Sequence, residues 1–138
     1  MDVRRTAELT DRVRDSGLRA TTPRVEVLAA LEDLGGHRTA EEVHDALAAR
    51  LPRSSVYNVL SSLADAGLVL RADAGPGAVL YEAGDRWHHH FVCRRCRRVF
   101  DVECVTGERP CLTPGTEVGV VEEAQVIFRG ICTECSER

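Results

Sequence analysis

Apolar residues recur every three or four positions through residues 6–67, which is the spacing of one buried face along a helix. The pattern predicts four helices joined by short connections. Thr22 before Pro23 is expected to cap the start of the second helix. Thr39, with Glu42 three residues later, forms a capping box for the third. The side chains expected to face inward are Leu9, Val13, Val25, Leu28, Leu31, Val43, Ala46, Leu47, Val56, Leu60 and Leu63.

The fourth helix is followed by a predicted hairpin. Ser54 or Ser55 is expected to cap this helix, and Gly67 to end it. Extended runs at 68–72 and 78–82 then flank a turn rich in glycine and proline. Helices followed by a two-stranded wing are the order of a winged helix-turn-helix, whose last helix enters a DNA major groove. A small helical domain with an incidental hairpin is the alternative.

The pattern changes after residues 83–85, which are predicted to be a hinge. Alternating or short apolar runs predict strands at 88–93, 99–103 and 125–131. The segment 104–118 is rich in glycine, proline and threonine and favours no regular element. The chain is therefore expected to combine a helical first half with a strand-rich second half.

Composition and charge fit a globular protein of the cytosol. No apolar run approaches the roughly 20 residues that span a bilayer, so no membrane partner is expected. The net charge is −4 and all 18 basic residues are arginine, which a GC-rich genome explains as well as DNA binding does. Their distribution says more, because Arg19 and Arg24 belong to an arginine-rich segment at 1–24. Arg53 lies in a window at 46–64 that contains no acid, as phosphate contacts require.

The spacing of the cysteines is the most specific feature of the chain. Cys93 and Cys96 form one Cys-x2-Cys pair, and Cys132 and Cys135 form a second. Two residues between thiolates direct both sulfurs to one ion, and four thiolates complete a closed tetrahedral Zn²⁺ site. In a cytosolic chain such pairs indicate metal or redox chemistry rather than disulfides. A dithiol redox switch is the alternative.

A histidine run lies just before the first cysteine pair. Alternate side chains of a strand face opposite ways, so His88 and His90 share one face and His89 points away. Two imidazoles on one face can bind one ion. Glu82 and Asp101, on neighbouring predicted strands, are plausible oxygen donors. Such a mixed set suits Fe²⁺, Mn²⁺, Zn²⁺ or Ni²⁺.

Four further residues of these types give weaker indications. Cys104 and Cys111 lie in the unassigned segment and could pair, be oxidised or simply be buried, of which burial is favoured. His37 and His44, each taken alone, are expected to be surface histidines, the second on the exposed side of its helix.

Together, five segments resemble the ferric uptake regulator family over essentially the whole chain. They are Leu18–Arg24, His37–Val43, Ser55–Leu60, the histidine run into Cys93–Cys96, and Gly130–Cys135. The resemblance implies an α+β protein with an N-terminal winged helix-turn-helix DNA-binding domain at 1–82 and a hinge at 83–85. A small α/β dimerisation domain with a structural zinc would follow at 86–138.

The resemblance also implies functional residues and partners. The partners would be a palindromic double-stranded DNA operator and a second copy of the chain. The structural Zn²⁺ would be bound by Cys93, Cys96, Cys132 and Cys135. A regulatory Fe²⁺ or Mn²⁺ bridging the two domains would be bound by His37, Glu82, His88, His90 and Asp101. The DNA-binding candidates are Tyr57, which would contact bases, with Arg53, Ser55, Asn58, Arg19 and Arg24.

The branch within the family is indicated by fewer residues. Peroxide sensors of the family resemble this chain in carrying Asp at the position of Asp101, where iron sensors usually carry Glu. The stretch 101–113, with Cys104 and Cys111, is similar to the actinobacterial repressors of catalase-peroxidase. The resemblance therefore predicts a peroxide-sensing repressor of oxidative-stress genes and no enzyme. The link from Pro52 is shorter than is usual in the family, which leaves the start of the recognition helix open.

Two alternatives to peroxide sensing stay open. One is a repressor of metal uptake that responds to the level of iron, zinc or nickel. The other is a thiol-based redox sensor that uses Cys104 and Cys111. A zinc hydrolase or deaminase is not supported, because the cysteine pairs form a closed site and no His-x-Glu motif accompanies the histidines.

Overall fold

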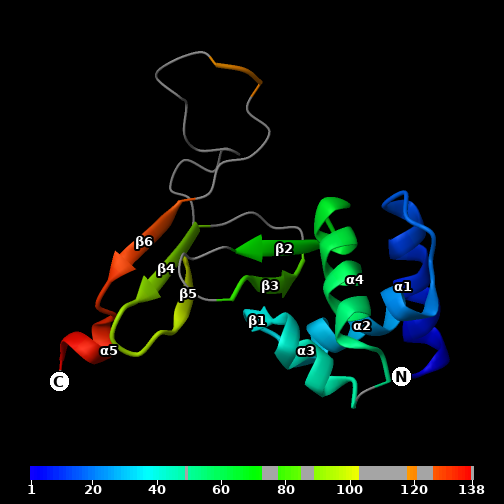
Figure 1. Ribbon diagram of the computed structural model, residues 1–138, viewed down its shortest axis with the longest axis horizontal. Helices are drawn as coiled ribbons and strands as arrows, with labels where there is room; N and C mark the ends of the chain where they lie inside the picture. The colour runs from blue at the N-terminus through cyan, green and yellow to red at the C-terminus, as the bar shows by residue number, and fades with distance from the viewer. Residues whose placement is uncertain (49, 73–77, 85–88, 103–117, 121–125, 138) are drawn as a thin grey trace. The chain divides into compact units, whose positions relative to one another are not determined.

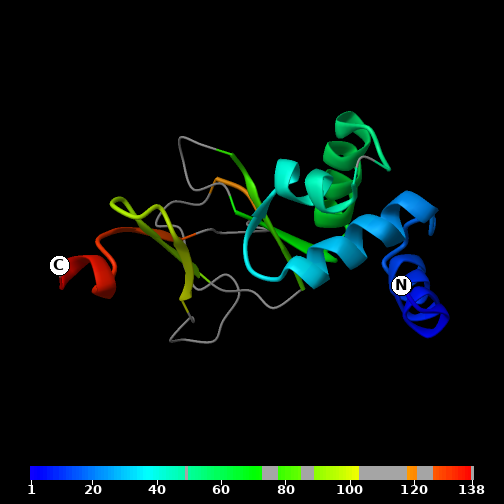
Figure 2. The ribbon, with the colours of Figure 1, turned by 90° about the horizontal axis from the view of Figure 1, so that it is seen from below.

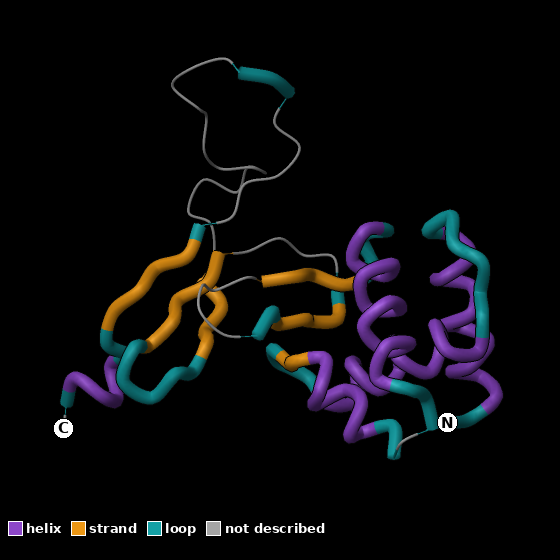
Figure 3. The backbone as a smooth tube through the Cα atoms, in the orientation of Figure 1, coloured by secondary structure: helices purple, strands orange, loops and turns teal. Residues whose placement is uncertain are grey.

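The computed structural model describes residues 1–48, 50–72, 78–84, 89–102, 118–120 and 126–137. The chain divides into two compact units, Met1–Asp85 and Arg86–Arg138. Unit 1 holds the long helices, and the described part of unit 2 consists of strands β4, β5 and β6, the short helix α5 and their connections (Figure 3). The predicted turn of the wing, His88, Cys104 and Cys111 lie outside the described residues.

The α+β class that the sequence predicts is confirmed (Figure 1). Besides its helices, unit 1 has three strands, which form a sheet of the order β1-β3-β2. The sheet of unit 2 has the order β5-β4-β6. The elements of unit 1 are α1 (Val3–Asp15), α2 (Thr22–Leu34), β1 (Arg38–Thr39), α3 (Ala40–Ala46), α4 (Arg53–Asp65), β2 (Val69–Ala72) and β3 (Leu80–Ala83). Those of unit 2 are β4 (His89–Cys93), β5 (Val99–Val102), β6 (Ile127–Gly130) and α5 (Thr133–Ser136).

The helix starts follow local hydrogen-bond chemistry, with two corrections. The capping box of Thr39 and Glu42 is confirmed in both directions. The N-cap of α2 is Thr21 rather than Thr22, because the Thr21 hydroxyl accepts from the Arg24 N–H at 3.4 Å. Pro23 then falls within the first turn, where its missing N–H has no helical partner to lose.

The fourth helix begins earlier than expected. Neither Ser54 nor Ser55 caps it, because Pro52 is the N-cap with an extended ψ of 153°. The Pro52 carbonyl accepts the first helical hydrogen bond from the Val56 N–H at 3.2 Å. The helix ends at Asp65, and Gly67 follows with the positive φ of 81° that favours glycine.

The core of unit 1 is close to the predicted one. Apart from Ala46, every side chain expected to face inward is buried, including the three fully enclosed positions on α4. Ala46 is exposed, because Val43 and Leu47, four residues apart, are the side chains of this segment that reach the core. α1 packs against α2 (Figure 2), and β2 pairs with β3 as an antiparallel hairpin. This arrangement confirms the predicted winged helix.

Unit 2 is built on a mixed three-stranded sheet. Strand β4 lies in the middle, antiparallel to β5 and parallel to β6. The enclosed core of its described part consists of three cysteines, Cys93, Cys132 and Cys135. The apolar side chains packed against them are only partly buried. Sulfur atoms therefore take the place that aliphatic side chains occupy in unit 1.

Candidate metal centres and nucleic-acid interface

The structure brings the four paired cysteines of unit 2 together. Cys93 ends β4, Cys96 lies in the turn after it, and Cys132 and Cys135 lie at the N-cap and inside α5. Their sulfur atoms all lie within 4.8 Å of one another, and the Cys96 and Cys132 sulfurs are 3.9 Å apart. Sulfurs at Zn–S distances of about 2.3 Å in a tetrahedron are about 3.8 Å apart. The donor set and its spacing therefore fit Zn²⁺.

Backbone hydrogen bonds distinguish the four thiols from one another. The N–H groups of Cys132 and Cys96 each donate to the Cys93 sulfur at 3.4 Å. These bonds, the one from Cys132 first, lower the pKa of Cys93 to about 5. Burial raises the pKa of Cys135 to about 12. The backbone hydrogen bonds thus favour the thiolate of Cys93, which is the form that binds metal.

In unit 1, His37 and Glu82 form a largely buried pair. His37 lies just before β1, and β1 pairs with β3, which carries Glu82. The His37 Nε2 and Glu82 Oε2 atoms are 3.3 Å apart, and the side chains are only 10% and 19% exposed. The expectation of a surface histidine at 37 is therefore wrong. The strand pairing draws this loop against the sheet, which no local pattern in the sequence indicates.

In unit 2, the strand register places His90 opposite Asp101. The His90 Nε2 and Asp101 Oδ1 atoms are 4.0 Å apart, and the His90 side chain is 8% exposed. The other face of β4 is also covered, because His89 is buried with its ring edge-on to Phe128 at 6.2 Å. Each unit therefore places a largely buried histidine, His37 or His90, beside a carboxylate.

A third group of donors lies on α3 and was missed by the sequence analysis. His44 is not a surface residue: its side chain is 16% exposed, and its Nδ1 lies 3.7 Å from Asp45 Oδ1. Glu41 lies in the same group, and donor atoms of all three residues are within 4.8 Å of one another. The Glu41 carboxylate also pairs with Arg53 at 3.1 Å. His44 and Asp45 follow Glu41 by three and four residues, a spacing that places all three on one face of a helix. This spacing could have predicted the cluster.

Helix α4 presents its polar side to solvent. Val56, Leu60 and Leu63 are fully buried, whereas Tyr57 is 48% exposed. Of the predicted DNA-binding residues on this helix, Arg53 and Asn58 are also exposed and Ser55 is half-buried. The remaining two candidates are Arg19, which lies before α2, and Arg24, which lies in its first turn. The Arg24 guanidinium donates to the Arg19 carbonyl at 2.7 Å.

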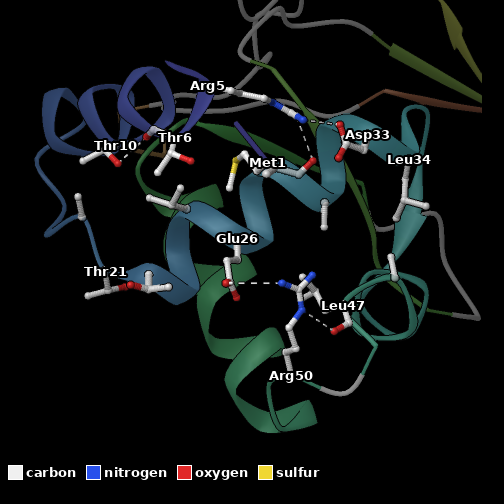
Figure 4. Close-up of a pocket in the computed structure, with 16 residues that line it drawn as sticks. Met1, Arg5, Thr6, Thr10, Thr21, Glu26, Asp33, Leu34, Leu47 and Arg50 are labelled. Atoms are coloured by element: carbon white, nitrogen blue, oxygen red, sulfur yellow. Dashed lines mark hydrogen bonds and ion pairs between the residues drawn. The ribbon is translucent and has the colours of Figure 1, made fainter. Parts of the chain in front are cut away.

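A hollow of about 720 Å³ in unit 1 is lined by α1, α2 and the end of α3 (Figure 4). Its charged side chains are paired, Arg5 with Asp33 at 2.7 Å and Arg50 with Glu26 at 3.9 Å. Neither histidine nor cysteine lines it, and small aliphatic and threonine side chains make up the rest. The hollow contains none of the candidate ligands.

Within the described ranges, no helix is long and apolar enough to cross a membrane.

Comparison with known proteins relates these features to one family. Residues 15–109 match the model of the ferric uptake regulator family. The chain is 41% identical over 132 residues to the transcriptional regulator FurA of Mycobacterium tuberculosis, covering 91% of this chain and 88% of FurA. It is 27% identical over 130 residues to the peroxide-responsive repressor PerR of Staphylococcus epidermidis, covering 91% and 86%. The ferric uptake regulator from Pseudomonas aeruginosa with manganese has a similar structure, with a TM-score of 0.71, 26% identity and coverage of 89% and 96%.

Proposed function

Because the chain belongs to the ferric uptake regulator family of metal-responsive, DNA-binding dimeric transcriptional regulators, we propose that it is a repressor controlled by a histidine- and carboxylate-bound Fe²⁺ or Mn²⁺. Membership makes it a regulator rather than an enzyme. The observation that carries the proposal is the largely buried histidine that lies beside a carboxylate in each unit. It would act in the cytoplasm, where its operator lies.

The four-cysteine cluster would hold a structural Zn²⁺. All four positions of a tetrahedral ion would be filled by Cys93, Cys96, Cys132 and Cys135, so no open position is left for a substrate. The ion would connect the end of β4 to the C-terminal segment, which are far apart in sequence. Its binding free energy would then contribute directly to the folding of unit 2.

The regulatory ion would be shared by the two units. A pair such as His37 and Glu82 offers two donors, as does the pair of His90 and Asp101, whereas Fe²⁺ and Mn²⁺ take more ligands. We propose that both pairs and His88 bind one ion. A ligand shifts a conformational equilibrium only through different affinities for its states. An ion held from both units would favour one arrangement of them, and in a homodimer this would place two copies of α4 one DNA turn apart on a palindromic operator.

The exposed side of α4 would read the operator. Tyr57, beside the buried face, and Asn58, opposite it, are both exposed, as base or sugar-phosphate contacts require. Arg53 at the first position of the helix would contact phosphate, with Ser55 close behind it. Arg19 and Arg24 would supply further phosphate contacts.

The DNA-reading proposal is tested with variants of exposed residues. Tyr57→Ala should weaken binding to double-stranded DNA selected from a random library by the Mn²⁺-loaded protein. Arg53→Ala should lower the affinity for all DNA sequences. It should also reduce the slope of log affinity against log salt concentration by about one. Arg94→Ala, at an exposed arginine of unit 2 outside the arginine-rich segment, is the control. Unchanged binding by both α4 variants in fluorescence anisotropy would mean that another surface reads the DNA.

The metal proposal has its own experiment. Mn²⁺ should raise DNA affinity of the wild type by about 5–150-fold, the usual range of coupling between two sites. His37→Ala and His90→Ala should each lose this increase while keeping their zinc. His44→Ala should keep it, because His44 belongs to the separate cluster on α3. If the His37 and His90 variants respond to Mn²⁺ as the wild type does, the regulatory ion binds elsewhere.

We further propose that hydrogen peroxide is the signal. The support is the aspartate at 101 and the similarity to a peroxide-responsive repressor. Bound Fe²⁺ would supply the electron chemistry that cleaves the peroxide bond. One oxygen atom would be transferred to a liganding imidazole, His37 or His88, and the other would leave as water. The altered ring would no longer bind metal, and the repressor would leave its operator.

Comparison of two metal forms tests this signal. Peroxide should release the Fe²⁺-loaded protein from DNA and add the mass of one oxygen to His37 or His88 but not to His44. The Mn²⁺-loaded protein should stay bound at the same dose. An Fe²⁺-loaded protein that stays bound would favour the regulation of metal uptake. Intact histidines with oxidised Cys104 and Cys111 in both forms would favour a thiol-based sensor.

A further inference from the structure

Arg98 contacts both halves of the cysteine cluster. It follows the first Cys-x2-Cys pair and precedes β5. Its Nε donates to the Cys96 sulfur at 3.4 Å, and its Nη2 lies 3.8 Å from the Cys132 sulfur. The same Nη2 donates to the Glu134 carboxylate, which lies between the cysteines of the second pair. One guanidinium therefore joins two chain segments more than 30 residues apart.

The Arg98 side chain is fixed from two sides. Its guanidinium carbon lies 5.2 Å from the centre of the Phe100 ring, at a distance typical of a cation–π contact. Glu134 holds the other side of the group. A lysine could not make these contacts together, because its ammonium group is a point charge, whereas the planar guanidinium directs several N–H groups at once.

Arg98 contacts the most exposed cysteine of the cluster. Cys96 is exposed, whereas Cys93, Cys132 and Cys135 are at most 7% exposed. Four thiolates around a dication carry a net charge of about −2. A positive group that donates hydrogen bonds to such sulfurs stabilises their charged form. It also reduces their tendency to take up a proton or attack an electrophile, because nucleophilicity falls as basicity falls.

We propose that Arg98 is a positioning residue of the zinc–thiolate centre, which holds the two cysteine pairs around the ion and shields Cys96. In this role Arg98 sets the rate at which the centre loses zinc. The inference rests on the proposed zinc. It adds a residue that binds no metal itself but determines how long the ion is retained. Arg94, an exposed arginine in the same turn, provides a matched comparison.

The first measurement is zinc release from the full-length protein to a coloured chelator. Removal of a partner that supports metal ligands typically costs 10–100-fold in metal affinity. Arg98→Ala should therefore release zinc about 10–100 times faster than the wild type. Arg98→Lys, which keeps the positive charge but not the planar guanidinium, should release zinc at an intermediate rate. Arg94→Ala should match the wild type.

The second measurement is spectroscopic and separates hydrogen bonding to sulfur from a general loss of structure. Replacing zinc by Co²⁺ gives a sulfur-to-metal charge-transfer band whose energy depends on the thiolates. Arg98→Ala should move this band to lower energy, because the sulfur loses an N–H donor, while the Arg94→Ala band stays in place. Iodoacetamide should label Cys96 faster in Arg98→Ala than in the wild type.

The outcomes distinguish this inference from the zinc proposal. A wild-type protein that binds no zinc would overturn both. A zinc-loaded wild type with Arg98→Ala unchanged in release rate and spectrum would overturn the role of Arg98 alone. If Arg98→Ala folds poorly, the comparison of Arg98→Lys with Arg94→Ala still tests the role of Arg98. Zinc release from Arg98→Lys at the wild-type rate would show that the planar guanidinium has no role.

Discussion

Replacing one cysteine of the cluster should unfold unit 2 and leave unit 1 intact. In Cys132→Ser a hydroxyl takes the place of a thiolate that is 7% exposed and 3.9 Å from the Cys96 sulfur. A structural Zn²⁺ contributes about 10–16 kcal/mol, whereas a whole domain is stable by only about 5–15 kcal/mol. Hydrophobic burial in the described part of unit 2 is too small to replace this free energy. Its apolar members, Phe91, Phe100 and Ile131, are partly buried, and even full burial stabilises by about 1.5–3 kcal/mol each.

The assay is a two-dimensional amide NMR spectrum with a parallel zinc measurement. Signals of unit 1 should keep their dispersion, because its core consists of buried aliphatic side chains and Tyr81 and contains no cysteine. Signals of unit 2 should collapse to the range of an unfolded chain. Cys104→Ser, which removes a cysteine outside the cluster, is the control and should keep its zinc. A Cys132→Ser protein that is zinc-free yet keeps a folded unit 2 would refute the reasoning.

Four further outcomes follow from single residues. Leu60→Ala, at a fully buried position, should lower the unfolding free energy of unit 1 by about 2–5 kcal/mol in urea without loss of zinc, and a change below 1 kcal/mol would contradict the packing. Thr39→Ala should cost about 1 kcal/mol through the lost capping box, while Thr39→Ser should retain most of it. Zinc affinity, measured by competition with a coloured chelator, should fall as the pH falls, because each of the four thiols must lose its proton to bind the ion, and an affinity independent of pH would contradict thiolate ligation. Asp101→Glu should make the Fe²⁺-loaded repressor less sensitive to peroxide in the DNA-release assay, and unchanged sensitivity would remove the aspartate from the proposed signal.

Periodicity predicted what depends on the chain's own geometry. The buried face of α4 at Val56, Leu60 and Leu63 follows directly from the helical repeat. The capping box is equally local, because its two hydrogen bonds join residues three apart. The spacing within each cysteine pair likewise indicates a shared ion, since both sulfurs project from one turn.

Burial that depends on distant neighbours could not be predicted in this way. Taken alone, His37 and His44 were expected at the surface, yet both are largely enclosed. Only the family resemblance implied that His37 is a metal ligand. The enclosure of His37 depends on β1, a two-residue strand that is too short to show a period of its own. The start of α4 was misplaced for a different reason. Serines are frequent N-caps, but here Pro52 takes the extended N-cap conformation before either serine is reached.

The donor chemistry of the two proposed metals suits them to different tasks. An ion enclosed by four thiolates in the core of unit 2 would be bound with the folding free energy of that unit, so its loss would unfold the domain and could not serve as a reversible signal. A mixed set of imidazoles and carboxylates is the weaker and less selective kind of site. Asp101 is itself 45% exposed. An ion at the proposed site would be able to exchange with free metal, and peroxide would be able to reach it, while the fold stayed intact. The mixed set is therefore the one whose occupancy a regulator can report.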